Sequence, residues 1–157
     1  TADCIPVLLY DRQRRIVAAV HAGWRGTVNR ILAKTLHRMQ SAYGTEGTDV
    51  IACIGPGISL DSFEVGDEVY EAFRTENFPM EYISVWKPET HKYHIDLWAA
   101  NRLQLSDFGV PPRQIENAGI CTYRQHEDFF SARRLGIKSG RILSGIMLNG
   151  QEKGERK

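Results

Sequence analysis

Three features are scarce in this chain of 157 residues: cysteine, an excess of charge of one sign, and long apolar runs. Three cysteines, an odd and sparse set, give no disulfide framework, which favours free thiols in a reducing cytoplasm. Lysine and arginine total 20 against 19 for aspartate and glutamate, so we expect neither nucleic acid nor an anionic membrane as a partner. Every apolar run is shorter than the roughly 20 residues that a membrane-spanning helix needs.

The remaining composition is typical of one folded domain. Hydrophobic residues make up 42% of the chain and charged residues 25%, a balance found in globular proteins rather than in disordered ones. We expect residues 1–148 to form a single domain and residues 149–157 to form a solvated tail. The chain starts at Thr1, without methionine and almost directly on an apolar segment, so we also expect the domain to lack its N-terminal portion.

Apolar patterning predicts a mixture of strands and helices without strict strand–helix–strand alternation. Short apolar runs predict strands over residues 5–10, 16–20, 49–54, 82–86, 115–120 and 142–148. Apolar residues at three- and four-residue spacing predict helices over residues 27–43, 66–74 and about 96–105. We therefore predict an α+β fold, a layered sandwich of mixed, largely antiparallel sheets flanked by helices.

The first two predicted strands carry Cys4 at the start of one and His21 at the end of the other. A turn centred on Arg12 and Gln13 would make them an antiparallel hairpin with Cys4 directly opposite His21. Opposed Cβ atoms lie roughly 4.5–5.5 Å apart, which suits a thiolate and an imidazole that share one zinc ion. The glycine-flanked loop HAGWRG begins at His21, and irregular loops at strand ends are where functional sites are usually built.

Two ligands do not complete a catalytic zinc site, which takes three protein ligands and leaves one position open. The candidates for the third are His91, His94, His126 and Cys121. Cys121 stands at the end of a predicted strand and is the best placed of them, whereas Cys53 lies inside a strand and is expected in the core. Cys4 and His21 could equally be ordinary core or rim residues. Asp3 could either orient a metal ligand or cap the entrance to the strand.

Five motifs, in order along the chain, resemble those of one family. They are TADC before an apolar strand, VAAVHAGWRG, IGPGIS followed by FEVGDEV, IDLWAANRLQL, and GICTYRQHEDFFSARR. Together they closely resemble the YfiH/YlmD-like family, often labelled the laccase-domain or multicopper polyphenol oxidase family, which includes purine nucleoside phosphorylases. The resemblance covers the chain from Thr1 to about Leu148, and HAGWRG paired with an upstream ADC is a specific combination.

The resemblance implies a zinc centre of one cysteine and two histidines. Cys4 matches the cysteine of TADC and His21 matches the histidine of HAGWRG. The family's third ligand is a histidine in a segment that precedes TADC, so we expect it upstream of Thr1. The implied activities are phosphorolysis of adenosine, inosine, guanosine and methylthioadenosine, and hydrolytic deamination of adenosine. Purine nucleosides and phosphate are the partners that these activities imply.

Substrate binding is expected of Arg25 in HAGWRG, of Arg133 in FFSARR, and of Cys121. Phosphorolysis needs positive charge for phosphate, and a guanidinium offers phosphate a bidentate match. The structural alternative for each arginine is a salt bridge or a stacked packing role.

Two other functions stay open. Cys4 and His21 could form a nucleophile–base pair without metal, as in a hydrolase that acts on peptidoglycan precursors. The polyphenol oxidase label fits the chemistry least, because multicopper oxidation needs many histidine ligands and this chain has five histidines.

Overall fold

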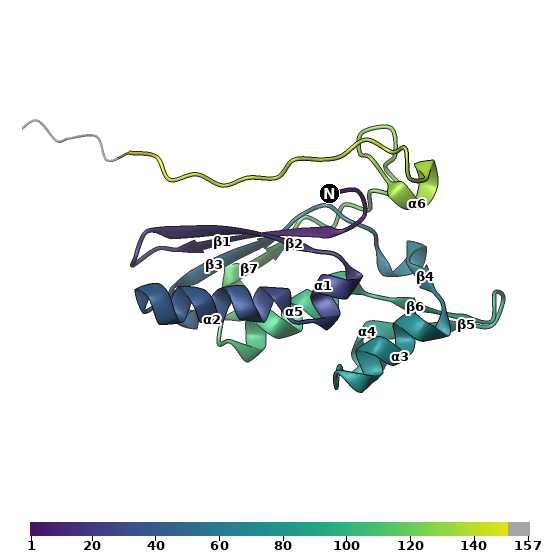
Figure 1. Ribbon diagram of the computed structural model, residues 1–157, viewed down its shortest axis with the longest axis horizontal. Coiled ribbons are helices and arrows are strands. Elements are labelled where there is room, and N and C mark those ends of the chain that lie inside the picture. The colour runs from purple at the N-terminus through teal and green to yellow at the C-terminus, as the bar shows by residue number, and fades with distance from the viewer. Residues whose placement is uncertain (151–157) are drawn as a thin grey trace, which may run out of the picture.

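The computed structural model describes residues 1–150, which form two β-sheets with helices packed against them (Figure 1). The strands are β1 (Ile5–Asp11), β2 (Ile16–Ala22), β3 (Val50–Ile54), β4 (Glu64–Val65), β5 (Ser84–Lys87), β6 (Lys92–Ile95) and β7 (Ile115–Asn117). The helices are α1 (Trp24–Val28), α2 (Ile31–Tyr43), α3 (Asp67–Thr75), α4 (Met80–Ile83), α5 (Leu97–Asp107) and α6 (Ala132–Leu135). Short 3₁₀ helices lie at Gly47–Asp49, Leu60–Ser62 and Pro112–Gln114. Among these helices of residues 1–150, none has the length and apolar character to cross a membrane.

The larger sheet has the strand order β2–β1–β3–β7 and the smaller sheet the order β4–β6–β5. Strand β1 pairs antiparallel with both β2 and β3, whereas β3 and β7 run parallel. Both pairs of the smaller sheet are antiparallel. Helices α2 and α5 lie along one face of the larger sheet, while α3 and α4 lie beside the smaller one (Figure 1). The predicted α+β fold with mixed, largely antiparallel sheets is therefore confirmed.

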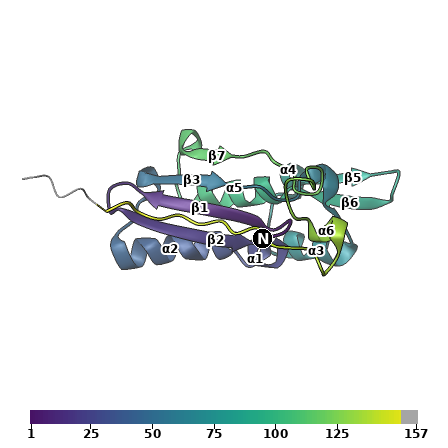
Figure 2. The same cartoon turned by 90° about the horizontal axis from the view of Figure 1, so that it is seen from above.

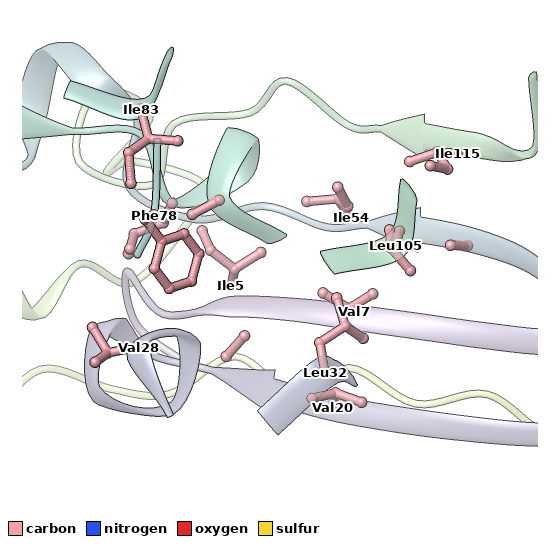
Figure 3. Close-up of a cluster of buried hydrophobic side chains, with 14 of the residues drawn as sticks. Ile5, Val7, Val20, Val28, Leu32, Ile54, Phe78, Ile83, Leu105 and Ile115 are labelled. Carbon is pink, nitrogen blue, oxygen red and sulfur yellow. The ribbon is translucent and has the colours of Figure 1, made fainter. Parts of the chain in front are cut away.

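The main core lies between the larger sheet and its helices. Because side chains alternate along a strand, β1 directs Ile5, Val7 and Leu9 to this face, where all three are fully buried. Helix α2 adds Leu32 and Leu36, which lie four residues apart on one face and are also fully buried. Figure 3 shows these elements sharing one apolar cluster with β3, α5 and β7. This packing holds β1 in place and with it the residues that lead into the strand.

The opposite face of β1 and β2 is covered by residues 142–148, which run along it as an extended segment (Figure 1, Figure 2). Every second residue is half-buried, namely Ile142, Ser144, Ile146 and Leu148. Hydrogen bonds in both directions join Ile142 to Thr1, at 2.6 and 2.7 Å. The strand predicted here is wrong, although the two-residue period is present. The segment lies on the face of a sheet, where its backbone cannot extend the ladder of hydrogen bonds.

The helix predicted over residues 27–43 is in fact two helices, α1 and α2, separated by a break at Arg30. Arg30 has a left-handed φ of 57°. The Thr27 carbonyl accepts hydrogen bonds from the Arg30 N–H at 3.0 Å and from Gln104 Nε2 at 3.2 Å. The Gln104 side-chain oxygen accepts in turn from the Ala33 N–H, near the start of α2, at 3.2 Å. A buried glutamine of α5 therefore satisfies backbone groups on both sides of the break.

Other local predictions need smaller corrections. Strand β5 begins at Ser84, because the first residues of the strand predicted over 82–86 belong to α4. Strand β7 ends earlier than predicted, at Asn117. Cys53, predicted in the core, is exposed because the alternate residues of β3 face the core instead. The predicted tail, residues 149–157, lies outside the described residues except for its first two, which are exposed.

The hairpin of β1 and β2 is confirmed, but its turn lies one residue later than predicted. The buried Asp11 carboxylate sets this turn, because its Oδ1 accepts from the N–H groups of Gln13 and Arg14, both at 2.9 Å. Arg15 then takes a left-handed φ of 54° and returns the chain into β2. Asp11 therefore pairs with Ile16, and every other pair of the hairpin follows from this register.

Replacing Asp11 by alanine should lower the free energy of unfolding by about 1–3 kcal/mol near neutral pH, because two N–H groups lose a charged acceptor. Burial alone would raise the pKa of Asp11, but the hydrogen bonds from Arg14 and Gln13 outweigh it, and the pKa falls below its ordinary 3.8. A carboxylate with a lowered folded pKa stabilises the protein above its unfolded pKa. That contribution is lost as the pH falls through the folded pKa. Urea unfolding over this acid range should therefore show the wild type and Asp11→Ala converging in stability.

The control is Asp61→Ala, which removes an exposed carboxylate 3.2 Å from Arg124. It should change the stability by less than about 1 kcal/mol, as exposed ion pairs do. A stability difference between the wild type and Asp11→Ala that stays constant into strong acid would contradict the role assigned to this carboxylate.

Candidate metal centre

Cys4 lies in the bend that leads into β1, and His21 lies near the end of the neighbouring strand β2. Pro6 is the residue directly opposite His21, so the predicted opposition of Cys4 and His21 is wrong. The later turn shifts the pairing by two residues and brings Gly23 level with Cys4. Because a shift of two residues keeps a side chain on the same face, Cys4 and His21 are diagonal neighbours on one face of the hairpin.

Gly23 provides the space that these two side chains share. A Cβ atom at Gly23 would stand 2.8 Å from Cys4 Sγ and 3.9 Å from His21 Nε2. The sulfur and the ring nitrogen therefore both face one point that only glycine leaves open. A zinc ion takes thiolate and imidazole ligands at roughly 2.3 and 2.0 Å, so this pair of donors around a shared space fits such an ion.

The protonation of the two side chains also suits metal binding. Partial desolvation lowers the pKa of His21 below its ordinary 6.5, so the ring is neutral near neutral pH and keeps a lone pair for a cation. Burial, and then the neighbouring Asp3 carboxylate, raise the pKa of the Cys4 thiol above 9.0. Without a cation Cys4 is therefore a protonated thiol, and a divalent ion is the partner that would favour its thiolate.

Two hollows adjoin the pair, and both are lined by Cys4 and Trp24. One, of about 430 Å³, also contains Arg25, whose guanidinium lies 4.2 Å from the centre of the Trp24 ring. The other, of about 310 Å³, extends to Phe63 and Arg133. The Arg133 guanidinium lies 5.4 Å from the Phe63 ring, and its Nη1 donates to a backbone carbonyl at 2.9 Å. The structure thus brings each predicted arginine to a hollow that Cys4 also lines.

Cys121, the remaining predicted substrate-binding residue, lines neither of these hollows. Its Sγ accepts hydrogen bonds from the Ser59 N–H at 3.4 Å and the Ser59 hydroxyl at 3.1 Å, and donates one to the Ser62 hydroxyl oxygen at 3.5 Å. Burial raises the pKa of Cys121, but these hydrogen bonds outweigh it, and the net pKa lies below 9.0. Its side chain is therefore occupied by the two serines rather than by Cys4 and His21.

The histidines considered as third ligands have other surroundings. His94 Nδ1 donates to the Leu60 carbonyl at 2.9 Å, and its Nε2 lies 3.8 Å from the Glu64 carboxylate. His91 lies between β5 and β6, with its ring 6.4 Å from that of Trp86. Within residues 1–150, no three histidine, cysteine, aspartate or glutamate side chains are grouped so that they could hold a metal ion. The described residues therefore contribute a pair of candidate ligands, Cys4 and His21.

Sequence reasoning did not assign a role in the site to Gly23, Trp24 or Phe63. The signal for Gly23 was available, because it follows His21 by two residues and so shares its face of the hairpin. Trp24 stands next in the chain and could have been expected nearby. Phe63 is far from Cys4 in the sequence, and only the tertiary fold brings the two residues to the same hollow. Local sequence patterns do not predict such a contact.

A family model described as multi-copper polyphenol oxidoreductase laccase matches residues 1–149. Over 149 residues, the chain is 64% identical to a Bacteroides thetaiotaomicron protein named purine nucleoside phosphorylase, a match that covers 95% of this chain and 55% of that protein. Over 146 residues it is 51% identical to adenosine deaminase RL5 from an unknown prokaryotic organism, covering 93% of this chain and 55% of that protein.

Among solved structures, the Bacillus licheniformis hypothetical protein YfiH is similar, with a TM-score of 0.79 and 34% identity. That likeness covers 85% of this chain and 50% of the other. The chain thus spans about half the length of the curated relatives it matches.

The Cys4 thiol should be alkylated slowly by iodoacetamide near neutral pH, and its rate should rise to half-maximum only above pH 9.0. The reason is that burial and the Asp3 charge both oppose formation of the reactive thiolate. The measurement uses a chain in which Cys53 and Cys121 are changed to serine, so that Cys4 is the one thiol present, with a short cysteine peptide as the control. A half-maximum below that of the peptide would contradict this account and indicate a thiolate–imidazolium pair.

Proposed function

The chain belongs to the family described as multi-copper polyphenol oxidoreductase laccase, and we propose that it forms part of a zinc-dependent purine nucleoside phosphorylase that also deaminates adenosine. The observation that carries the proposal is the shared space at Gly23, which Cys4 Sγ and His21 Nε2 both face. The names of the relatives at 64% and 51% identity support the two activities. The proposed substrates are adenosine, inosine, guanosine and methylthioadenosine, with phosphate.

Cys4 and His21 would hold the zinc ion from the start of β1 and the end of β2. The described residues offer this pair and no larger group of donors. The third ligand in this proposal is the histidine that the family resemblance implies upstream of Thr1. When bound, zinc activates water for attack and polarises groups of the substrate. The chain's own contribution is to present a thiol and a neutral imidazole to one open space.

The two hollows that Cys4 and Trp24 both line are the proposed substrate site. Their volumes, about 310 and 430 Å³, fall within the range of roughly 300–1,000 Å³ that is common for small-molecule pockets. Arg25 is proposed to bind phosphate, since it shares a hollow with both zinc ligands. Arg133 is proposed to contact the nucleoside from the second hollow. Cys121 would act at most indirectly, because its side chain faces the two serines.

Residues 1–148 would belong to one catalytic domain in this proposal. The free thiols of Cys4, Cys53 and Cys121 suit a reducing compartment, so we place the enzyme in the cytoplasm.

The alternative functions receive less support. A Cys–His hydrolase needs a thiol whose pKa is lowered, whereas the pKa of Cys4 is raised. Copper-dependent polyphenol oxidation, which the family description names, calls for many histidine ligands around the metal. Of the chain's five histidines, His21 alone lines the hollows beside Cys4.

In the full-length protein that carries this sequence, Cys4→Ser and His21→Ala should each abolish stoichiometric zinc. The rate of inosine phosphorolysis should then fall by more than roughly 100-fold. Replacing a residue that only hydrogen-bonds to a metal ligand costs up to roughly 100-fold, and loss of the ligand itself should cost more. Zinc is measured by elemental analysis after dialysis, and turnover by release of hypoxanthine. We expect the 157-residue chain alone to show neither stoichiometric zinc nor turnover, because one ligand is missing from it.

The matched controls are Cys53→Ser and His37→Gln, which change the same residue types at exposed positions. Both should keep zinc and activity at wild-type levels. Zinc retained at one per chain in Cys4→Ser, or turnover that survives a strong chelator but not a thiol alkylator, would contradict the proposal.

A further inference from the structure

Asp3, the residue before Cys4, takes a backbone conformation that residues other than glycine seldom adopt. Its φ is 76°, in the left-handed region, and the residue is only 9% exposed. Aspartate tolerates this region better than most residues, but the conformation persists only where the surroundings hold it. The turn of the chain at Asp3 sets the direction in which Cys4 leaves the bend.

Three hydrogen bonds hold Asp3 in this conformation. Its Oδ1 accepts from the Thr122 hydroxyl at 2.8 Å, and its Oδ2 accepts from the Arg133 N–H at 2.7 Å. Its main-chain oxygen accepts from the Ile58 N–H at 2.9 Å. Bonds to an ionised carboxylate are among the strong ones in proteins. The carboxylate thus ties the start of β1 to two segments that lie 119 and 130 positions further along the chain.

The same carboxylate stands between two groups of the proposed site. Cys4 is its neighbour in the chain, and the backbone of Arg133 is its hydrogen-bond donor. Cys4 and Arg133 line one hollow together with Trp24. The placement of the Cys4 thiol relative to the Arg133 guanidinium therefore depends on the bonds that Asp3 makes.

We propose that Asp3 is a positioning residue that fixes Cys4 and Arg133 relative to each other, so that the zinc ligand and the substrate-binding guanidinium form one preorganised unit. The inference rests on the proposed function for the roles of Cys4 and Arg133. Of the two roles that the sequence left open for Asp3, orienting a metal ligand is therefore favoured over capping the entrance to the strand.

Two substitutions at Asp3 separate geometry from charge. In Asp3→Gly, the glycine can adopt the left-handed backbone conformation, but both hydrogen bonds to the carboxylate are lost. Asp3→Asn also tolerates that backbone and can keep both bonds, because its oxygen accepts from the Arg133 N–H while its NH₂ donates to a rotated Thr122 hydroxyl. The control is Gln114→Ala, which removes another buried side chain with two hydrogen bonds, at 3.0 and 2.6 Å, to backbone carbonyls near the opposite end of β1.

The first readout is zinc affinity, measured by chelator competition on the full-length protein. Asp3→Gly should weaken it by roughly 10–100-fold, while Asp3→Asn and Gln114→Ala should stay within about threefold of the wild type. The second readout does not depend on zinc. Amide hydrogen exchange on the 157-residue chain should show that Asp3→Gly loses protection jointly around Cys4 and around Arg133, and that Asp3→Asn restores it.

Wild-type zinc affinity in Asp3→Gly would overturn the proposal. So would a loss of zinc affinity in Asp3→Asn as large as that in Asp3→Gly, because it would show that the carboxylate acts through its charge. A full-length wild type that binds no zinc would defeat the proposed function instead. The exchange measurement then still decides on Asp3. Protection unchanged at either segment in Asp3→Gly would refute the positioning role, whereas loss at both segments, reversed in Asp3→Asn, supports it.

Discussion

Two backbone N–H groups donate to the buried Asp11 carboxylate, and the geometry of the candidate site depends on the turn that they fix. With Asp11 at the end of β1, the ladder places Pro6 opposite His21. Cys4 then meets the open space at Gly23, which the His21 ring also faces. A slip of one residue would turn His21 to the opposite face, so the register decides whether the pair exists at all.

The fold supports this space from several sides. The loop after β2 is closed by the Gly23 carbonyl, which accepts from the Thr27 N–H at 2.8 Å. Thr27 is in turn held by Gln104 of α5, whose Nε2 donates to its carbonyl. On the other side, the Asp3 carboxylate joins the entrance of β1 to the backbone of Arg133. The candidate ligands therefore lie on short segments whose positions are set by side chains from distant parts of the chain.

Local sequence patterns were sufficient to predict those helices and strands whose formation depends on neighbouring residues in the chain. The apolar strands β1 and β2 were predicted for this reason, as was the end of α2 before Gly44, which has a left-handed φ of 71°. The break at Arg30 was missed because its cap, Gln104, comes from another helix. Residues 142–148 have the period of a strand, but only the tertiary fold shows that they lie on a sheet's face. The pairing of Cys4 with Gly23 depended on one residue in the turn, which periodicity cannot resolve.

X-ray absorption at the zinc edge of the zinc-loaded, full-length protein tests the central claim most directly. If Cys4 and His21 share the ion, the first shell contains one sulfur at about 2.3 Å, with the remaining ligands nitrogen or oxygen at about 2.0 Å. The sulfur shell should persist in Cys53→Ser, whereas any zinc that Cys4→Ser retains should have nitrogen and oxygen neighbours alone. A first shell of nitrogen and oxygen alone in the wild type, or a sulfur that remains in Cys4→Ser, would contradict the account.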